Sequence, residues 1–126
     1  MFNLPKDDSR FSWTRHIKNK MIFYHISKNM VIKIFRNPDR YEEGIATDTI
    51  ASMKVKKNNS KNKPKETEVW LMYKINNPLR RKPTDKKTKS KILMISTWIY
   101  PGRTKKGDSI PIPEEILAEL ETMLYD

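Results

Sequence analysis

His16 and Lys20 have the side-chain chemistry for acid–base catalysis on a phosphodiester. Histidine is the only side chain whose unperturbed pKa lies between pH 5 and 8, so His16 is the candidate proton donor or acceptor. Lys20 follows one helical turn later and would bring a positive charge to the same helix face. Cleavage of RNA through its 2′-hydroxyl needs both kinds of group, together with residues that orient the reacting atoms. Thr97 and Tyr100, with Tyr73 as a third candidate, could orient them from later apolar segments.

A structural role for His16 is the alternative. In that interpretation the imidazole joins a helix to the sheet through hydrogen bonds and takes no part in catalysis. The other histidine, His25, is expected in a turn between two helices.

The basic residues are concentrated in two segments. Residues 54–65 contain six lysines and no acid, and residues 80–91 contain seven basic residues and one acid. Outside these segments the chain has 13 basic and 14 acidic residues, so its net charge of +11 is local. Lysines near phosphates release condensed counterions and so give affinity that does not depend on base sequence. The predicted RNA contacts are Lys54, Lys56, Lys57, Lys61, Lys63, Lys65, Arg80, Arg81, Lys82, Lys86, Lys87 and Lys89. The alternative is that both segments are only solvated surface.

Metal and cofactor chemistry have little basis in this composition. The chain has no cysteine and two histidines, which excludes disulfides and thiolate zinc sites. The acidic residues show no paired spacing typical of metal-dependent nucleases. With three glycines and no glycine-rich phosphate motif, a nucleotide-binding loop is not expected either. We therefore expect no metal and no cofactor.

The sequence also predicts a protein of the cytoplasm. Its N-terminus lacks the basic start and apolar stretch of a signal peptide. It has no apolar run near the roughly 18 residues that a membrane-spanning helix needs, so we expect no membrane partner.

Apolar spacing predicts two short helices before Pro38. Ile17, Met21 and Tyr24 recur at helical intervals, with Ser12 or Thr14 as the N-cap. A second helix is expected to begin after Ser27 and to end before Pro38, since the residue preceding a proline avoids helical backbone.

Strands are predicted after Pro38. Residues 41–46 and 49–55 are typical of a hairpin, and residues 68–75 and 91–100 are rich in β-branched and aromatic side chains. The basic segments then fall in two long connections, 56–67 and 76–90, and residues 113–125 form a C-terminal helix. We therefore predict one α+β domain over residues 1–126, with a flexible lead-in over residues 1–10. In it, two N-terminal helices pack on a four-stranded antiparallel sheet, and the C-terminal helix is added.

The opening helices also resemble a known pattern. The residues concerned are Thr14, Arg15, His16, Met21, Ile26, Ser27, Val31, Ile34 and Pro38. They resemble an uncharacterised bacterial domain family that is grouped by fold with the RelE/ParE toxins. The resemblance extends in element order to Tyr100, with Ser96-Thr97-Trp98 similar to the family's final strand; the long basic connections and the C-terminal helix depart from it.

This resemblance implies ribonuclease chemistry in some members and gyrase inhibition in others. The leading hypothesis is a RelE/ParE-like RNA-binding protein, for which metal-independent endoribonuclease activity is a candidate function. A second hypothesis is a non-catalytic module that binds RNA or the ribosome. A third is a protein–protein module whose partner is an acidic, antitoxin-like chain.

Overall fold

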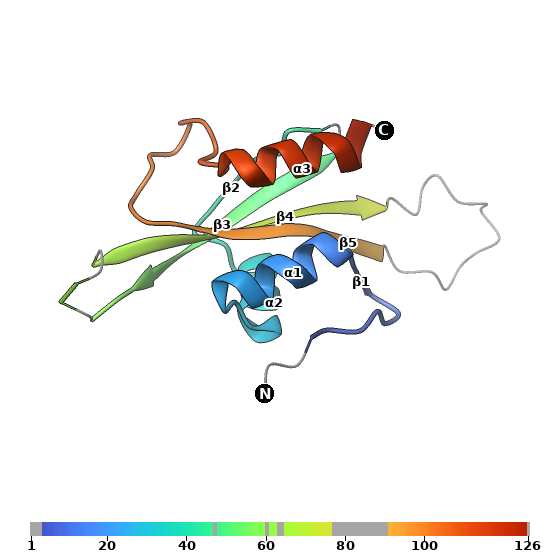
Figure 1. Ribbon diagram of the computed structural model, residues 1–126, viewed down its shortest axis with the longest axis horizontal. Coiled ribbons are helices and arrows are strands. Elements are labelled where there is room, and N and C mark those ends of the chain that lie inside the picture. Colours follow the sequence, from blue (N-terminus) through green and yellow to red (C-terminus); the bar gives the residue numbers. More distant parts are fainter. Residues whose placement is uncertain (1–3, 47, 60, 63–64, 77–90, 126) are drawn as a thin grey trace.

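A five-stranded sheet separates two layers of helices within the described residues (Figure 1). The computed structural model describes residues 4–46, 48–59, 61–62, 65–76 and 91–125. The strands are β1 (Phe11–Trp13), β2 (Arg40–Glu43), β3 (Thr49–Lys57), β4 (Glu66–Asn76) and β5 (Lys91–Tyr100). The helices are α1 (Arg15–Tyr24), α2 (Lys28–Arg36) and α3 (Glu114–Tyr125). The α+β class is therefore confirmed, with α1 and α2 on one face of the sheet and α3 on the other.

The sheet is mixed, which corrects the prediction of four antiparallel strands. Its order is β1-β5-β4-β3-β2, and β1 pairs in parallel with β5, with Phe11 opposite Ile92. A three-residue strand is too short to show a period. Its pairing partner also lies about 80 residues away, so no local pattern could reveal it. The remaining four strands form the predicted antiparallel meander.

Side-chain caps set the starts of both N-terminal helices. Thr14 accepts a hydrogen bond from the Ile17 amide, and Ser27 accepts one from the Met30 amide. Between the helices His25 takes a left-handed conformation at φ 56°, as its predicted place in the turn requires.

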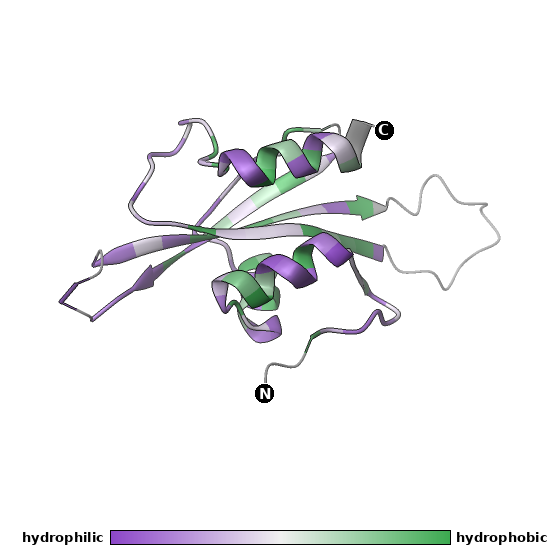
Figure 2. Ribbon diagram, in the orientation of Figure 1, coloured by the Kyte–Doolittle hydropathy of each residue, from purple (hydrophilic) through white to green (hydrophobic). Residues whose placement is uncertain are grey.

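Alternation along β4 divides the core between the two faces. Val69 and Leu71 pack toward α1 and α2, whereas Trp70 and Met72 pack toward α3. Figure 2 shows hydrophobic residues where the strands pass between the helices and hydrophilic ones at the β3–β4 hairpin. Eight residues that the apolar pattern places in the core are all buried: Trp13, Met21, Val31, Ile34, Trp70, Met72, Met94 and Leu120.

The first basic connection is shorter than predicted because both strands continue into it. The ladder runs to the pair Lys57–Glu66, and the Asn58 amide donates to the Lys65 carbonyl at 2.7 Å. Backbone pairing thus continues through exposed polar residues, whose side chains show no apolar period. The predicted connection over 76–90 begins one residue later, and residues 77–90 lie outside the described residues.

A bulge in β5 determines which way its second half faces. Met72 pairs with Ser96 but Tyr73 pairs with Met94, so Ile95 is an extra residue on β5. As a result Ser96 lies on the α3 face, like its partner Met72, and Thr97 lies on the other face.

Candidate functional site

The side chain of His16 connects two helices and the sheet. Its Nε2 lies 2.7 Å from the Ser96 hydroxyl, and its Nδ1 lies 2.7 Å from the Glu119 carboxylate. Lys20 donates to the other oxygen of Glu119 at 3.2 Å. We call these four residues the His16 cluster. Because a carboxylate can only accept, Nδ1 carries the proton, and Nε2 of the neutral ring accepts from the serine hydroxyl.

The environment of His16 favours the neutral ring. Burial lowers the pKa of His16 below its ordinary value and outweighs the opposing attraction of Glu119; the charge of Lys20 lowers it further. Desolvation acts to raise the pKa of Glu119. The hydrogen bond and positive charge of Lys20, together with the contact to His16, outweigh it, so the pKa of Glu119 is lowered. The pair is therefore a neutral imidazole held by a carboxylate.

This hydrogen-bond order is that of a serine–histidine–acid triad. A nucleophile must touch its substrate, however, and Ser96 is 0% exposed while His16 is 8% exposed. Both ring nitrogens of His16 already have protein partners. The arrangement is well suited to hold α1, β5 and α3 together, and it leaves His16 no free position toward a phosphodiester.

Two residues predicted to act with His16, Thr97 and Tyr100, do not lie beside it. Thr97 is buried on the opposite face of β5, and its hydroxyl donates to the Trp70 carbonyl at 2.6 Å. Tyr100 lies four residues beyond Ser96, about 13 Å along the strand, and packs against the α3-side core. Of the predicted catalytic set, only Lys20 shares a partner with His16.

Four lysines project from the β3–β4 hairpin. We call Lys56, Lys57, Lys61 and Lys65 the hairpin lysines; all four are exposed, and none forms an ion pair within the described part of the chain. The predicted contact Lys54 differs, because its ammonium group donates to the Asn37 carbonyl and lies 3.8 Å from Asp39.

The other predicted RNA contacts lie outside the described residues. They are Lys63, Arg80, Arg81, Lys82, Lys86, Lys87 and Lys89.

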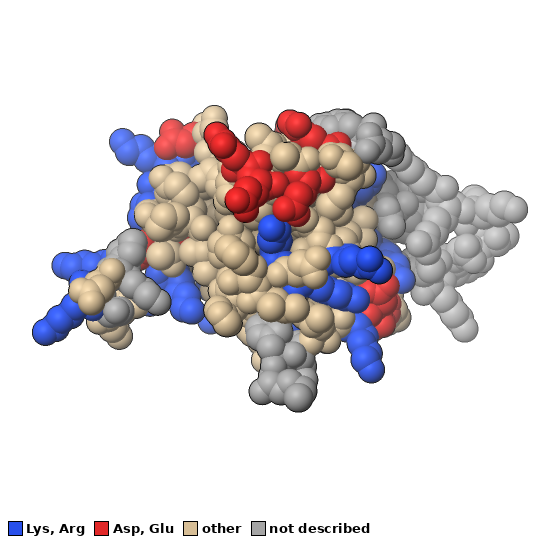
Figure 3. Space-filling view, in the orientation of Figure 1, with Lys and Arg blue, Asp and Glu red and all other residues tan. Residues whose placement is uncertain are grey.

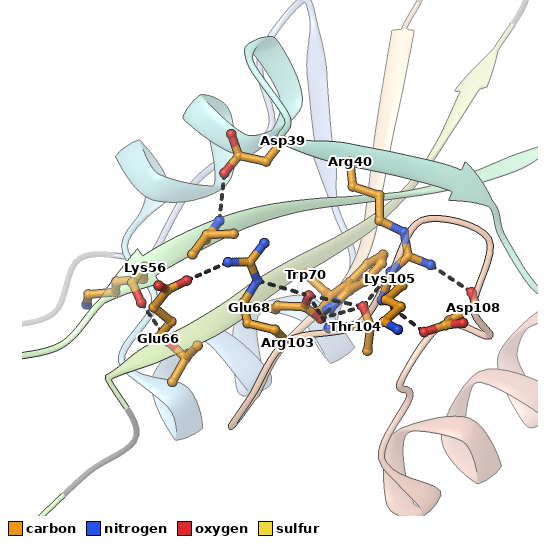
Figure 4. Close-up of polar contacts among 12 residues, drawn as sticks. Asp39, Arg40, Lys56, Glu66, Glu68, Trp70, Arg103, Thr104, Lys105 and Asp108 are labelled. Carbon is orange, nitrogen blue, oxygen red and sulfur yellow. Dashed lines mark hydrogen bonds and ion pairs between the residues drawn. The ribbon is translucent and has the colours of Figure 1, made fainter.

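The base of the hairpin carries a polar network (Figure 4). Arg103, from the connection after β5, pairs with Glu66 at 2.5 Å. Glu68 is fully buried and accepts from the Thr104 amide at 2.8 Å and from the Trp70 indole at 3.1 Å. The network therefore joins the connection after β5 to the hairpin.

Charge is unevenly spread over the surface. Figure 3 shows acidic side chains gathered over α3 and basic ones at the end where the β3–β4 hairpin projects. Four exposed glutamates account for the acidic surface of α3: Glu114, Glu115, Glu119 and Glu121. On this face, the basic end is thus separated from the acidic side chains of α3.

Comparisons with known proteins do not assign the chain to a family. No protein-family model, curated protein or solved structure matches the chain. Within the described residues, no three potential metal-binding side chains lie close enough to hold an ion, and no helix is long and apolar enough to cross a membrane. The similarity to the RelE/ParE group therefore rests on the sequence pattern alone.

Proposed function

We propose that this protein is a non-catalytic RNA-binding module whose main contact with RNA is the β3–β4 hairpin. The observation that carries the proposal is the set of four exposed hairpin lysines, which form no ion pair with any described residue, on a hairpin that projects from the body (Figure 1). An ammonium group already held by a carboxylate would gain less from a phosphate. These four are free to displace counterions from a nucleic-acid backbone.

Catalysis at His16 has weaker support than binding. The imidazole is buried, both nitrogens are occupied, and Thr97 and Tyr100 lie elsewhere. The sequence resemblance to the RelE/ParE group favours RNA as the ligand of the basic residues. Binding of RNA does not require its cleavage.

Neutralising the hairpin tests the proposal. We expect the variant with all four hairpin lysines changed to glutamine to bind a 20-nucleotide single-stranded RNA more weakly and with a shallower salt dependence. Each lost phosphate contact reduces the slope by about 0.7, so between 50 and 200 mM salt the wild type should lose about 50-fold more affinity than the variant. Fluorescence anisotropy at several salt concentrations measures both quantities.

A matched control removes the same charge elsewhere. Lys6, Lys18, Lys28 and Lys33 lie in or next to the N-terminal segment and the first two helices, and changing them to glutamine also lowers the net charge by four. This control should keep the wild-type slope. An equal reduction of slope in both variants would mean that RNA affinity depends only on the total charge of the protein. Tighter binding of an acidic polypeptide than of RNA would favour a protein partner.

A second experiment separates binding from cleavage. His16→Ala should keep wild-type RNA affinity, and neither protein should cleave RNA or ribosome-bound messenger in EDTA. Metal-independent cleavage by the wild type that a folded His16→Ala variant lacks would refute the non-catalytic assignment, because loss of a general acid or base costs about 10²–10⁴-fold in rate.

A further inference from the structure

A second basic element lies in the connection after β5. Lys105 and Lys106 occupy the first half of a turn over residues 105–108, and both are exposed. The Asp108 amide donates to the Lys105 carbonyl at 2.9 Å, and the Asp108 carboxylate accepts from the Lys105 amide at 2.9 Å. Gly107 has φ +92° at the third position, a value that type II turns require and that glycine adopts at low cost.

The body of the protein holds this turn in place. The Thr104 hydroxyl lies between Arg40 and buried Glu68 and contacts both. Arg40 also donates to the Asp108 carbonyl at 2.7 Å, and its guanidinium lies 5.2 Å from the Trp70 ring centre. The turn is thus anchored at both ends. Its backbone therefore loses little further conformational entropy when its two lysines bind a ligand.

The connection that leads into the turn starts at the base of the hairpin, and the turn itself lies against β2, where the Gly107 amide donates to Glu42 at 3.2 Å. Arg103 pairs with Glu66, which lies directly opposite Lys57 in the β3–β4 ladder. Lys105 follows Arg103 by two residues, a chain reach of about 7 Å. Figure 1 shows the connection after β5 arching over the end of the sheet from which the hairpin projects.

We propose that Lys105 and Lys106 form a second phosphate-binding element that contacts the same RNA backbone as the hairpin lysines. This inference rests on the proposed function and extends its site to a preorganised turn. Arg103 is not included, because Glu66 already holds its guanidinium. The ligand class is the sugar–phosphate backbone of RNA, whose charges a projecting hairpin and an adjacent fixed turn can contact together.

The test is the double variant Lys105→Gln/Lys106→Gln, measured against the same 20-nucleotide RNA. We expect weaker binding and a slope reduced by about 1.4, so that the wild type loses about sevenfold more affinity than the variant between 50 and 200 mM salt. The control Lys28→Gln/Lys33→Gln removes the same charge on α2 and should keep the wild-type slope. Circular dichroism and thermal unfolding establish that each variant is folded.

The outcomes separate this inference from the proposed function. If the hairpin variant loses slope and the turn variant does not, the turn is not part of the site and the hairpin assignment stands. If neither variant loses slope, both proposals fail. A slope change in the turn variant that persists when the hairpin lysines are already neutralised confirms that the two elements contact RNA independently.

Discussion

At the scale of single residues, His16 shows how a reactive side chain can serve structure. Its two nitrogens join Ser96 of β5 to Glu119 of α3, and the ring is almost wholly covered. Judged by residue type alone, a histidine beside a carboxylate and a hydroxyl suggests catalysis. The Ser96 hydroxyl is fully buried, and both nitrogens of His16 are held by protein groups.

The lowered pKa of His16 predicts acid-sensitive stability. The unfolded chain takes up the histidine proton near its ordinary pKa of about 6.5, whereas the folded protein resists it to lower pH. The contribution of the neutral ring is therefore complete above about pH 7 and falls as the pH drops below 6.5. The lowered pKa of Glu119 acts in the same direction below its ordinary value of 4.5.

Urea unfolding between pH 7.5 and 5 measures this effect. We expect His16→Gln to flatten the decline in unfolding free energy that the wild type shows over this range. His25→Asn removes the other histidine, outside the cluster and at a left-handed position that asparagine tolerates, and should keep the wild-type decline. A wild-type stability that does not fall on acidification would contradict the assignment of a neutral, buried ring.

At the scale of elements, the connection after β5 is held by a buried charge. Glu68 lies on β4 and is fully buried, yet its two oxygens accept from the Thr104 amide and hydroxyl and from Trp70. Burying a carboxylate is unfavourable unless hydrogen bonds compensate it. These three donors, together with the Arg103 guanidinium 3.8 Å from a Glu68 oxygen, supply that compensation. They also determine where the connection lies.

Thr104→Val tests the importance of this anchor. Valine has nearly the same shape but leaves Glu68 without a hydroxyl donor and removes one of the three acceptors of Arg40, which keeps Glu42 and the Asp108 carbonyl. We therefore expect a loss of about 1–3 kcal/mol in unfolding free energy. Thr122→Val is the control, since Thr122 is exposed and its hydroxyl donates, among the described residues, to the Ala118 carbonyl of its own helix at 3.3 Å. That change should stay within about 0.5 kcal/mol. Equal effects from the two substitutions would show that the anchor adds no stability.

At the scale of the whole molecule, the two basic segments are attached at opposite ends of the sheet. The β3–β4 hairpin turns at one end, and β4 ends at Asn76 and β5 begins at Lys91 at the other (Figure 1). The ten steps along β4 span about 33 Å. The points at which the two basic segments join the sheet are therefore about one strand length apart.

RNA length should reveal this separation. A duplex of six base pairs spans about 20 Å at most, whereas one of twenty base pairs exceeds the length of β4. We expect neutralisation of the second segment to weaken binding of the long duplex and to leave the short one unchanged. The residues to change to glutamine are Arg80, Arg81, Lys82, Lys86, Lys87 and Lys89. Equal weakening for both duplexes would mean that the second segment reaches the hairpin end.

Local pattern by itself determined most of the elements of this protein. Apolar spacing and the caps Thr14 and Ser27 place α1 and α2, and the β-branched run 91–100 coincides with β5. These features depend on neighbours within a few residues, so they can be read along the chain. The buried faces follow from the same periods.

Only the tertiary structure decided what those elements bring together. The parallel pairing of β1, the bulge at Ile95 and the contact between His16 and Ser96, 80 residues apart, depend on strand register and on packing between distant segments. The place of the turn at Lys105 and Lys106 was decided in the same way. Glu68 of β4 and Arg40 of β2 hold it over the sheet, and a local glycine signal shows that a turn exists without showing what lies next to it.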